Sequence, residues 1–102
     1  MDLQSAIKAA EDLVRRAAEK QRLGFAVSDL ASFSAIFQVA KAGQGSITLI
    51  NLDAEVEGQP GLKIQVIDWQ RPDGEVFRFH YWTYDNLAVE LAKVGIELPA
   101  AD

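Results

Sequence analysis

The fold is decided by the stretch RPDGEVFRFHYWTYD, residues 71–85. Its first four residues are typical of a type I turn that ends in a glycine bulge, and this three-residue loop pairs Arg71 with Glu75. Counting inward from that pair along two antiparallel strands predicts the opposite pairs Trp69–Phe77, Asp68–Arg78, Ile67–Phe79, Val66–His80 and Ile64–Trp82. The charge pair and the apolar pairs favour this register, because cross-strand neighbours of these kinds stabilise a sheet.

This register places apolar residues on both faces of the predicted sheet. One face carries Leu62, Ile64, Val66, His80 and Trp82, and the other carries Ile67, Trp69, Phe77, Phe79 and Tyr81. Hydrophobic alternation alone predicts that the phenylalanines are buried and that His80 and Trp82 point outward. The turn favours the reverse, with His80 and Trp82 beneath the helices. An apolar sheet face left in solvent usually marks a binding site, so we predict a contact surface at Ile67, Trp69, Phe77, Phe79 and Tyr81.

The rest of the chain is predicted to form two helices before the sheet and one after it. Apolar residues recur at three- and four-residue spacing over 3–22 and 29–42. Asp2 and Ser28 are placed to cap these helices, and Gly24 and Gly43 to end them. A period of two predicts strands over 47–57, 62–69 and 75–84, and Asp85 then caps a helix over 86–94. The prediction is a single α+β domain over residues 1–102: two N-terminal helices, a three-stranded antiparallel β-meander and a C-terminal helix.

Composition argues against several classes of protein. The chain has no cysteine, which excludes a disulfide framework, a thiolate nucleophile and a cysteine zinc site. Its formal net charge of −5 disfavours direct binding to nucleic acid, because neutralising phosphates requires a basic surface. No apolar run approaches the length of a bilayer span, and residues 1–16 lack the pattern of a signal peptide. We therefore expect a cytoplasmic protein with no membrane contact and no cofactor.

His80 is the only histidine, so it is the first candidate for chemistry. A general base needs a positioned partner and a nucleophile, and no nucleophile motif accompanies it. A metal site would have to be completed by carboxylates alone. We therefore favour a structural histidine with a hydrogen-bonded ring, and we predict no catalytic residue and no metal ligand. The alternative is a small-molecule site or minor enzyme, with a pocket between sheet and helices lined by Trp82, Tyr84 and Phe37 and with His80 as its polar group.

Acidic residues alternate along the strand predicted over 47–57. Alternate residues of a strand lie about 6.8 Å apart, which is close to the phosphate spacing of a nucleic-acid strand. Asp53, Glu55 and Glu57 could therefore mimic nucleic acid in a basic groove. An edge strand that carries charge against aggregation explains the same row more simply.

These observations together favour a small acidic interaction module without enzymatic activity. Tryptophan and tyrosine are enriched at interface hot spots, so we expect a homodimer that forms through the apolar sheet face or an edge strand. Another protein is the alternative partner. The size and charge of the chain are compatible with an immunity protein, an antitoxin or a phage-encoded inhibitor.

Overall fold

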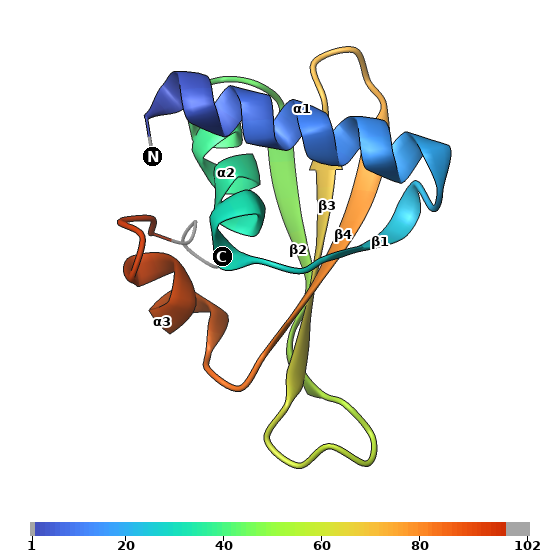
Figure 1. Cartoon of the computed structure of the whole chain (residues 1–102), viewed down its shortest axis with the longest axis vertical. Helices are drawn as coiled ribbons and strands as arrows, with labels where there is room; N and C mark the ends of the chain where they lie inside the picture. Colours follow the sequence, from blue (N-terminus) through green and yellow to red (C-terminus); the bar gives the residue numbers. More distant parts are fainter. Residues whose placement is uncertain (1, 98–102) are drawn as a thin grey trace.

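The computed structural model describes residues 2–97, apart from the side chains of residues 51–54. Seven elements follow one another along this part of the chain (Figure 1): α1 (Leu3–Glu19), β1 (Leu23–Val27), α2 (Leu30–Lys41), β2 (Ser46–Glu55), β3 (Lys63–Gln70), β4 (Val76–Thr83) and α3 (Leu87–Ala92). The predicted α+β class is confirmed. No helix within residues 2–97 is both long and apolar enough to cross a bilayer.

The sheet has four strands in the order β1-β4-β3-β2, and β1 runs parallel to β4 while the other pairs are antiparallel. The predicted three-stranded meander is therefore incomplete, because it lacks β1. Arg22, just before β1, holds this strand in place: its carbonyl accepts the N–H of Arg78 at 3.1 Å, and its Nε donates to the carbonyl of Val76 at 3.0 Å. The guanidinium of Arg22 also lies over the ring of Phe77, 4.9 Å from its centroid.

Helix α1 ends before the predicted position. The last residue of the helix is Glu19, and Gly24, which the sequence predicts as the terminator, lies inside β1. The positions that would continue the apolar stripe beyond Ala17 are Lys20 and Gln21, and both are polar and exposed. Without an apolar face to bury, another turn of helix gains little from packing.

The capping residues are close to those predicted. The Asp2 carboxylate accepts the N–H of Ser5 at 2.8 Å, which confirms the first cap. The second helix is capped by Asp29 rather than Ser28, and the third by Asn86 rather than Asp85. Each of these caps lies one residue later than predicted, because two adjacent residues can both accept the free N–H groups of a helix start.

The β3–β4 hairpin has the predicted register. The N–H of Arg71 donates to the Glu75 carbonyl at 2.8 Å, and the N–H of Gly74 donates to the Arg71 carbonyl at the same distance. All five predicted opposite pairs are present, from Trp69–Phe77 to Ile64–Trp82. The turn chemistry therefore predicts the pairing correctly.

The helices cover the face that the sequence analysis predicts to be exposed. In Figure 1, α1 crosses in front of the sheet with α2 beside it. Beneath them lie five residues with 0–9% of their surface exposed: Ile67, Trp69, Phe77, Phe79 and Tyr81. The prediction that these residues form an exposed contact surface is wrong. These strand residues belong to the hydrophobic core, and they pack against the buried faces of α1 and α2.

Aromatic packing shows why this face is the covered one. Phe33 of α2 stacks on Tyr81, with ring centroids 4.9 Å apart, and Phe25 of β1 meets Phe79 edge to face at 6.3 Å. Trp69 donates its indole N–H to the carbonyl of Gln44 at 2.9 Å, which ties the loop before β2 to the core. Large aromatic rings bury more apolar area than the side chains of the opposite face, and this burial is the main stabilising term.

Gly45 is required by the same loop. A Cβ atom there would lie 2.1 Å from the carbonyl oxygen of Gln70 and 2.9 Å from the Trp69 Nε1. Its φ of +93° is also strained for any other residue. The loop between α2 and β2 is thus fixed by a close backbone approach.

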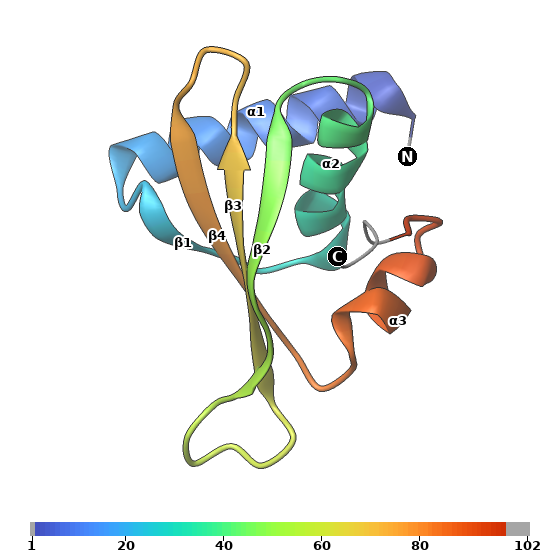
Figure 2. The same cartoon turned by 180° about the vertical axis from the view of Figure 1, so that it is seen from behind.

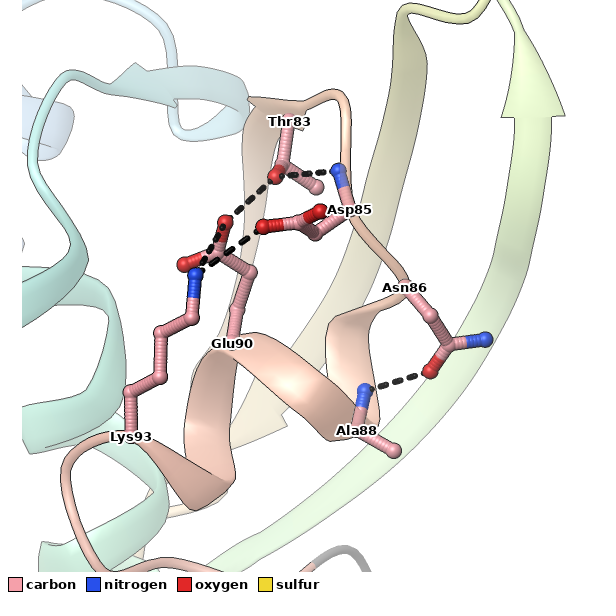
Figure 3. Close-up of polar contacts among 6 residues, drawn as sticks. All are labelled: Thr83, Asp85, Asn86, Ala88, Glu90 and Lys93. Atoms are coloured by element: carbon pink, nitrogen blue, oxygen red, sulfur yellow. Dashed lines mark hydrogen bonds and ion pairs between the residues drawn. The ribbon is translucent and has the colours of Figure 1, made fainter.

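Helix α3 is attached to the end of β4 by a polar network (Figure 3). The Thr83 hydroxyl donates to Glu90 Oε1 at 2.8 Å and accepts the N–H of Asp85 at 3.0 Å. Lys93 pairs with Asp85 at 3.0 Å and lies 3.9 Å from Glu90. Leu87 and Leu91 complete the attachment by burying their side chains in the core.

Candidate functional site

The second face of the sheet has no helix over it, as Figure 2 shows. We call it the open face and define it by strand alternation and register as Ala26, Ile64, Val66, Asp68, Arg78, His80 and Trp82. Val66 is buried but does not belong to the core cluster, which agrees with its position on this face. The open face is therefore a second surface with apolar and aromatic side chains.

Large apolar side chains on and around the open face are exposed to solvent. Trp82 is 38% exposed, and Ile50, at a register shift in the edge strand β2, is 45% exposed. Tyr84 follows the end of β4 and is 67% exposed. A Cβ atom at Gly61 would lie 3.7 Å from Tyr84, which places that ring beside the β2–β3 loop.

The charges of the open face neutralise each other. Arg78 binds Asp68 through two hydrogen bonds, from Nε to Oδ1 at 2.8 Å and from Nη2 to Oδ2 at 3.1 Å. This bond to Asp68 raises the pKa of the Arg78 guanidinium. A bidentate pair has a fixed geometry and leaves little net charge for an outside ligand. This described pair therefore adds almost no net charge to the open face of a chain that carries a net charge of −5.

His80 lies at the centre of the open face. Its ring is 5.9 Å from the ring of Trp82, in an edge-to-face arrangement. On its other side lies Gly24, where a Cβ atom would come within 3.6 Å of the imidazole Cε1. Burial lowers the pKa of His80, and the neighbouring charge of Arg78 lowers it further. The ring is therefore neutral near pH 7.

No hydrogen-bonded partner of His80 is found among the described side chains. Leaving aside residues 51–54, its ring lies beside Trp82 and Gly24, and no carboxylate or hydroxyl is hydrogen-bonded to it. A general base requires such a partner to orient it and a group to deprotonate. The hydrogen-bonded ring expected from the sequence is also not found among these residues.

The predicted small-molecule pocket is not formed, because its four residues are divided between the two faces. His80 and Trp82 belong to the open side of β4 and Tyr84 follows the end of this strand, whereas Phe37 is buried in α2 on the helical side. Phe37 lines a different cavity of about 470 Å³, together with Ala40, Lys41, Gly45, Ser46, Ile47, Ile96 and Glu97. The sheet therefore separates Phe37 from the other three residues of the predicted pocket.

The predicted acidic row is interrupted. Strand β2 ends at Glu55, so Glu57 lies in the following loop, and the pairing of β2 with β3 shifts register twice between Leu49 and Ala54. Glu55 and Glu57 are exposed, and the side chain of Asp53 lies outside the described residues. The regular spacing of alternate strand residues therefore does not extend from Glu55 to Glu57, and the position of Asp53 in the row is outside the described side chains.

Comparisons of the chain with protein-family models, with curated proteins and with solved structures found no match. The geometry and charge of the open face are therefore the indications of its role.

Proposed function

We propose that this protein is a non-enzymatic interaction module that pairs with a second copy of itself through the open face. The observation that supports this proposal is the exposed apolar surface around Trp82 on the face that lacks helices. Antiparallel sheets with one solvated face usually place polar residues on it. Here Ile64, Val66 and Trp82 occupy that face instead. Val66 is already buried, so the free energy gained when a partner covers this patch comes mainly from Trp82 and Ile64.

Charge favours an identical copy as the partner. The charged side chains among the residues that define the open face are Asp68 and Arg78, and they neutralise each other. At this pair, two copies can therefore meet without bringing like charges together, although each carries a net charge of −5. Nucleic acid is disfavoured because its phosphates would find only one guanidinium, which already has a carboxylate partner.

The size of the face predicts a weak dimer. Four strands about 4.8 Å apart, which have five to ten residues and about eight on average at about 3.4 Å per residue, give a face of roughly 15 by 27 Å. This is about 400 Å² from each copy, whereas a standard interface buries about 800 Å² per partner. We therefore expect association in the micromolar range, as for transient complexes.

Sedimentation velocity over a range of protein concentrations up to about 1 mM tests this proposal. The wild-type chain is expected to shift from monomer to dimer, and Trp82→Arg is expected to remain a folded monomer. Val89→Arg is the matched control, because Val89 is 51% exposed but lies on α3, outside the open face. A wild-type chain that is monomeric at every concentration would overturn the proposal and indicate a different partner for the open face. The proposal also fails if Trp82→Arg and Val89→Arg change the monomer–dimer equilibrium equally.

A further inference from the structure

His80 would lie inside any contact that covers the open face. It is on a central strand of the sheet, with Ala26 opposite it on β1 and Val66 opposite it on β3. Trp82, the most exposed aromatic residue within the face as defined, is its edge-to-face neighbour. A partner that covers Trp82 must therefore also remove water from the imidazole.

Among the side chains that the structure describes, the charged groups near His80 come from two strands. Arg78 precedes it by two residues on β4, and Asp68 on β3 holds the guanidinium of Arg78. The neighbouring part of β1 contributes Gly24 and Ala26, which do not titrate. No carboxylate within the described residues pairs directly with the imidazole, so a proton on the ring gains no ion pair to offset its desolvation.

We propose that protonation of His80 dissociates the self-associated form in mildly acidic solution, an inference that rests on the function proposed above. An isologous contact contributes two His80 rings to one interface, one from each copy. Covering the open face removes both rings from water, and desolvation disfavours the charged imidazole. The monomer therefore binds protons more readily than the dimer, and acid shifts the equilibrium toward the monomer.

The direction of this effect separates it from the effect of net charge. The net charge of −5 near pH 7 approaches zero as the pH falls toward the isoelectric point of about 4.7. That change alone reduces repulsion between copies and strengthens association. Protonation of His80 acts in the opposite direction. Weaker association at pH 5.5 than at pH 7.5 therefore identifies a group that must be neutral in the interface.

The size of the effect has an upper limit. The pKa of His80 in the monomer is at most the ordinary histidine value of 6.5. At pH 5.5 the protonated form of each ring therefore exceeds the neutral form by at most about tenfold. Two rings can thus raise the dissociation constant by at most about a hundredfold. Because burial and Arg78 lower the pKa of His80, the expected increase lies below that limit, and at least about threefold is needed to support the inference.

Sedimentation velocity of the full chain at pH 7.5 and pH 5.5, at constant ionic strength, tests the inference. Near-ultraviolet circular dichroism at each pH establishes that the chain stays folded. The wild-type dimer is expected to weaken at pH 5.5. His80→Gln keeps a polar side chain but cannot titrate there, so its association is expected to be unchanged or stronger in acid. His80→Arg carries a permanent charge and is expected to be monomeric at both pH values.

Each contrary result has a definite meaning. A wild-type dimer that is equally strong or stronger at pH 5.5 would overturn the inference and leave the proposed self-association intact. The inference also fails if His80→Gln weakens in acid as much as the wild type does. A wild-type chain that is monomeric at pH 7.5 and at about 1 mM would overturn both proposals.

Discussion

Phe79 and Trp82 lie on the same strand and point to opposite sides of it. The Phe79 side chain is fully buried between Phe25 and Phe77, whereas Trp82 remains 38% exposed. Phe79→Ala is therefore expected to lower the free energy of unfolding by about 3–5 kcal/mol, because it leaves a cavity in the core. Trp82→Ala is the control on the open face, and it is expected to lower the free energy of unfolding by about 1 kcal/mol.

Urea unfolding of both variants, followed by far-ultraviolet circular dichroism at a concentration where the chain is monomeric, measures this difference. A larger loss for Trp82→Ala than for Phe79→Ala would mean that the helices cover the other face of the sheet. The open face would then not exist, and the proposed interaction surface would have to be abandoned.

The candidate site was only partly predictable at the residue scale. Sequence alternation and the turn group His80 and Trp82 with Ile64 and Val66, and the structure has them on one face. Which face the helices cover depends on long-range packing, and the face predicted to be covered is the wrong one. The set with Trp69, Phe77 and Phe79 contains more aromatic volume, and this signal in the sequence would have favoured its burial.

Among the elements, α3 depends most on polar contacts. It has six residues, too few to be stable as an isolated helix. Its Glu90 carboxylate is only 14% exposed and accepts a hydrogen bond from the Thr83 hydroxyl (Figure 3). Thr83→Val keeps the shape of the side chain but removes this donor, so it is expected to cost about 1–3 kcal/mol of stability.

Hydrogen exchange of the α3 amides, together with urea unfolding, checks this expectation. Lys93→Met is the control, because the Lys93–Asp85 pair is about half exposed on both sides and is screened by water and salt. Its effect is expected to be smaller than that of Thr83→Val. Equal protection of α3 in wild type and Thr83→Val would show that Leu87 and Leu91 hold the helix without the network.

The elements differ in how strongly the local sequence specifies them. The β3–β4 hairpin is predicted with its register because the turn at 71–74 allows only a few pairings. Strand β1 is missed because five residues, LGFAV, give too short an alternation, and Gly24 resembles a helix end. Its parallel pairing with β4 joins residues that are 54–55 positions apart in the sequence, and local sequence patterns do not predict a contact over such a distance.

At the scale of the whole molecule, charge and apolar surface are separated. The chain carries a net charge of −5, yet the charged pair on the open face is neutral. Self-association is therefore favoured by the local apolar contact and opposed by the long-range repulsion between two acidic bodies. These two terms respond differently to salt, because salt screens the repulsion and has little effect on apolar burial.

This separation predicts that added salt strengthens the self-association. Two charges of −5, centred about 26 Å apart as the shortest dimension of the molecule suggests, repel by about 4 kcal/mol in unscreened water. Screening lengths of about 30 Å at 0.01 M salt and about 8 Å at 0.15 M reduce this to roughly 1.7 and 0.15 kcal/mol. The difference corresponds to roughly tenfold tighter association at the higher salt concentration, which sedimentation equilibrium at pH 7.5 can measure.

Trp82→Arg is the control for this salt effect and should remain monomeric at both salt concentrations. Association that weakens with salt would instead indicate an interface held by opposite charges, which the mutually neutralised Asp68–Arg78 pair does not provide.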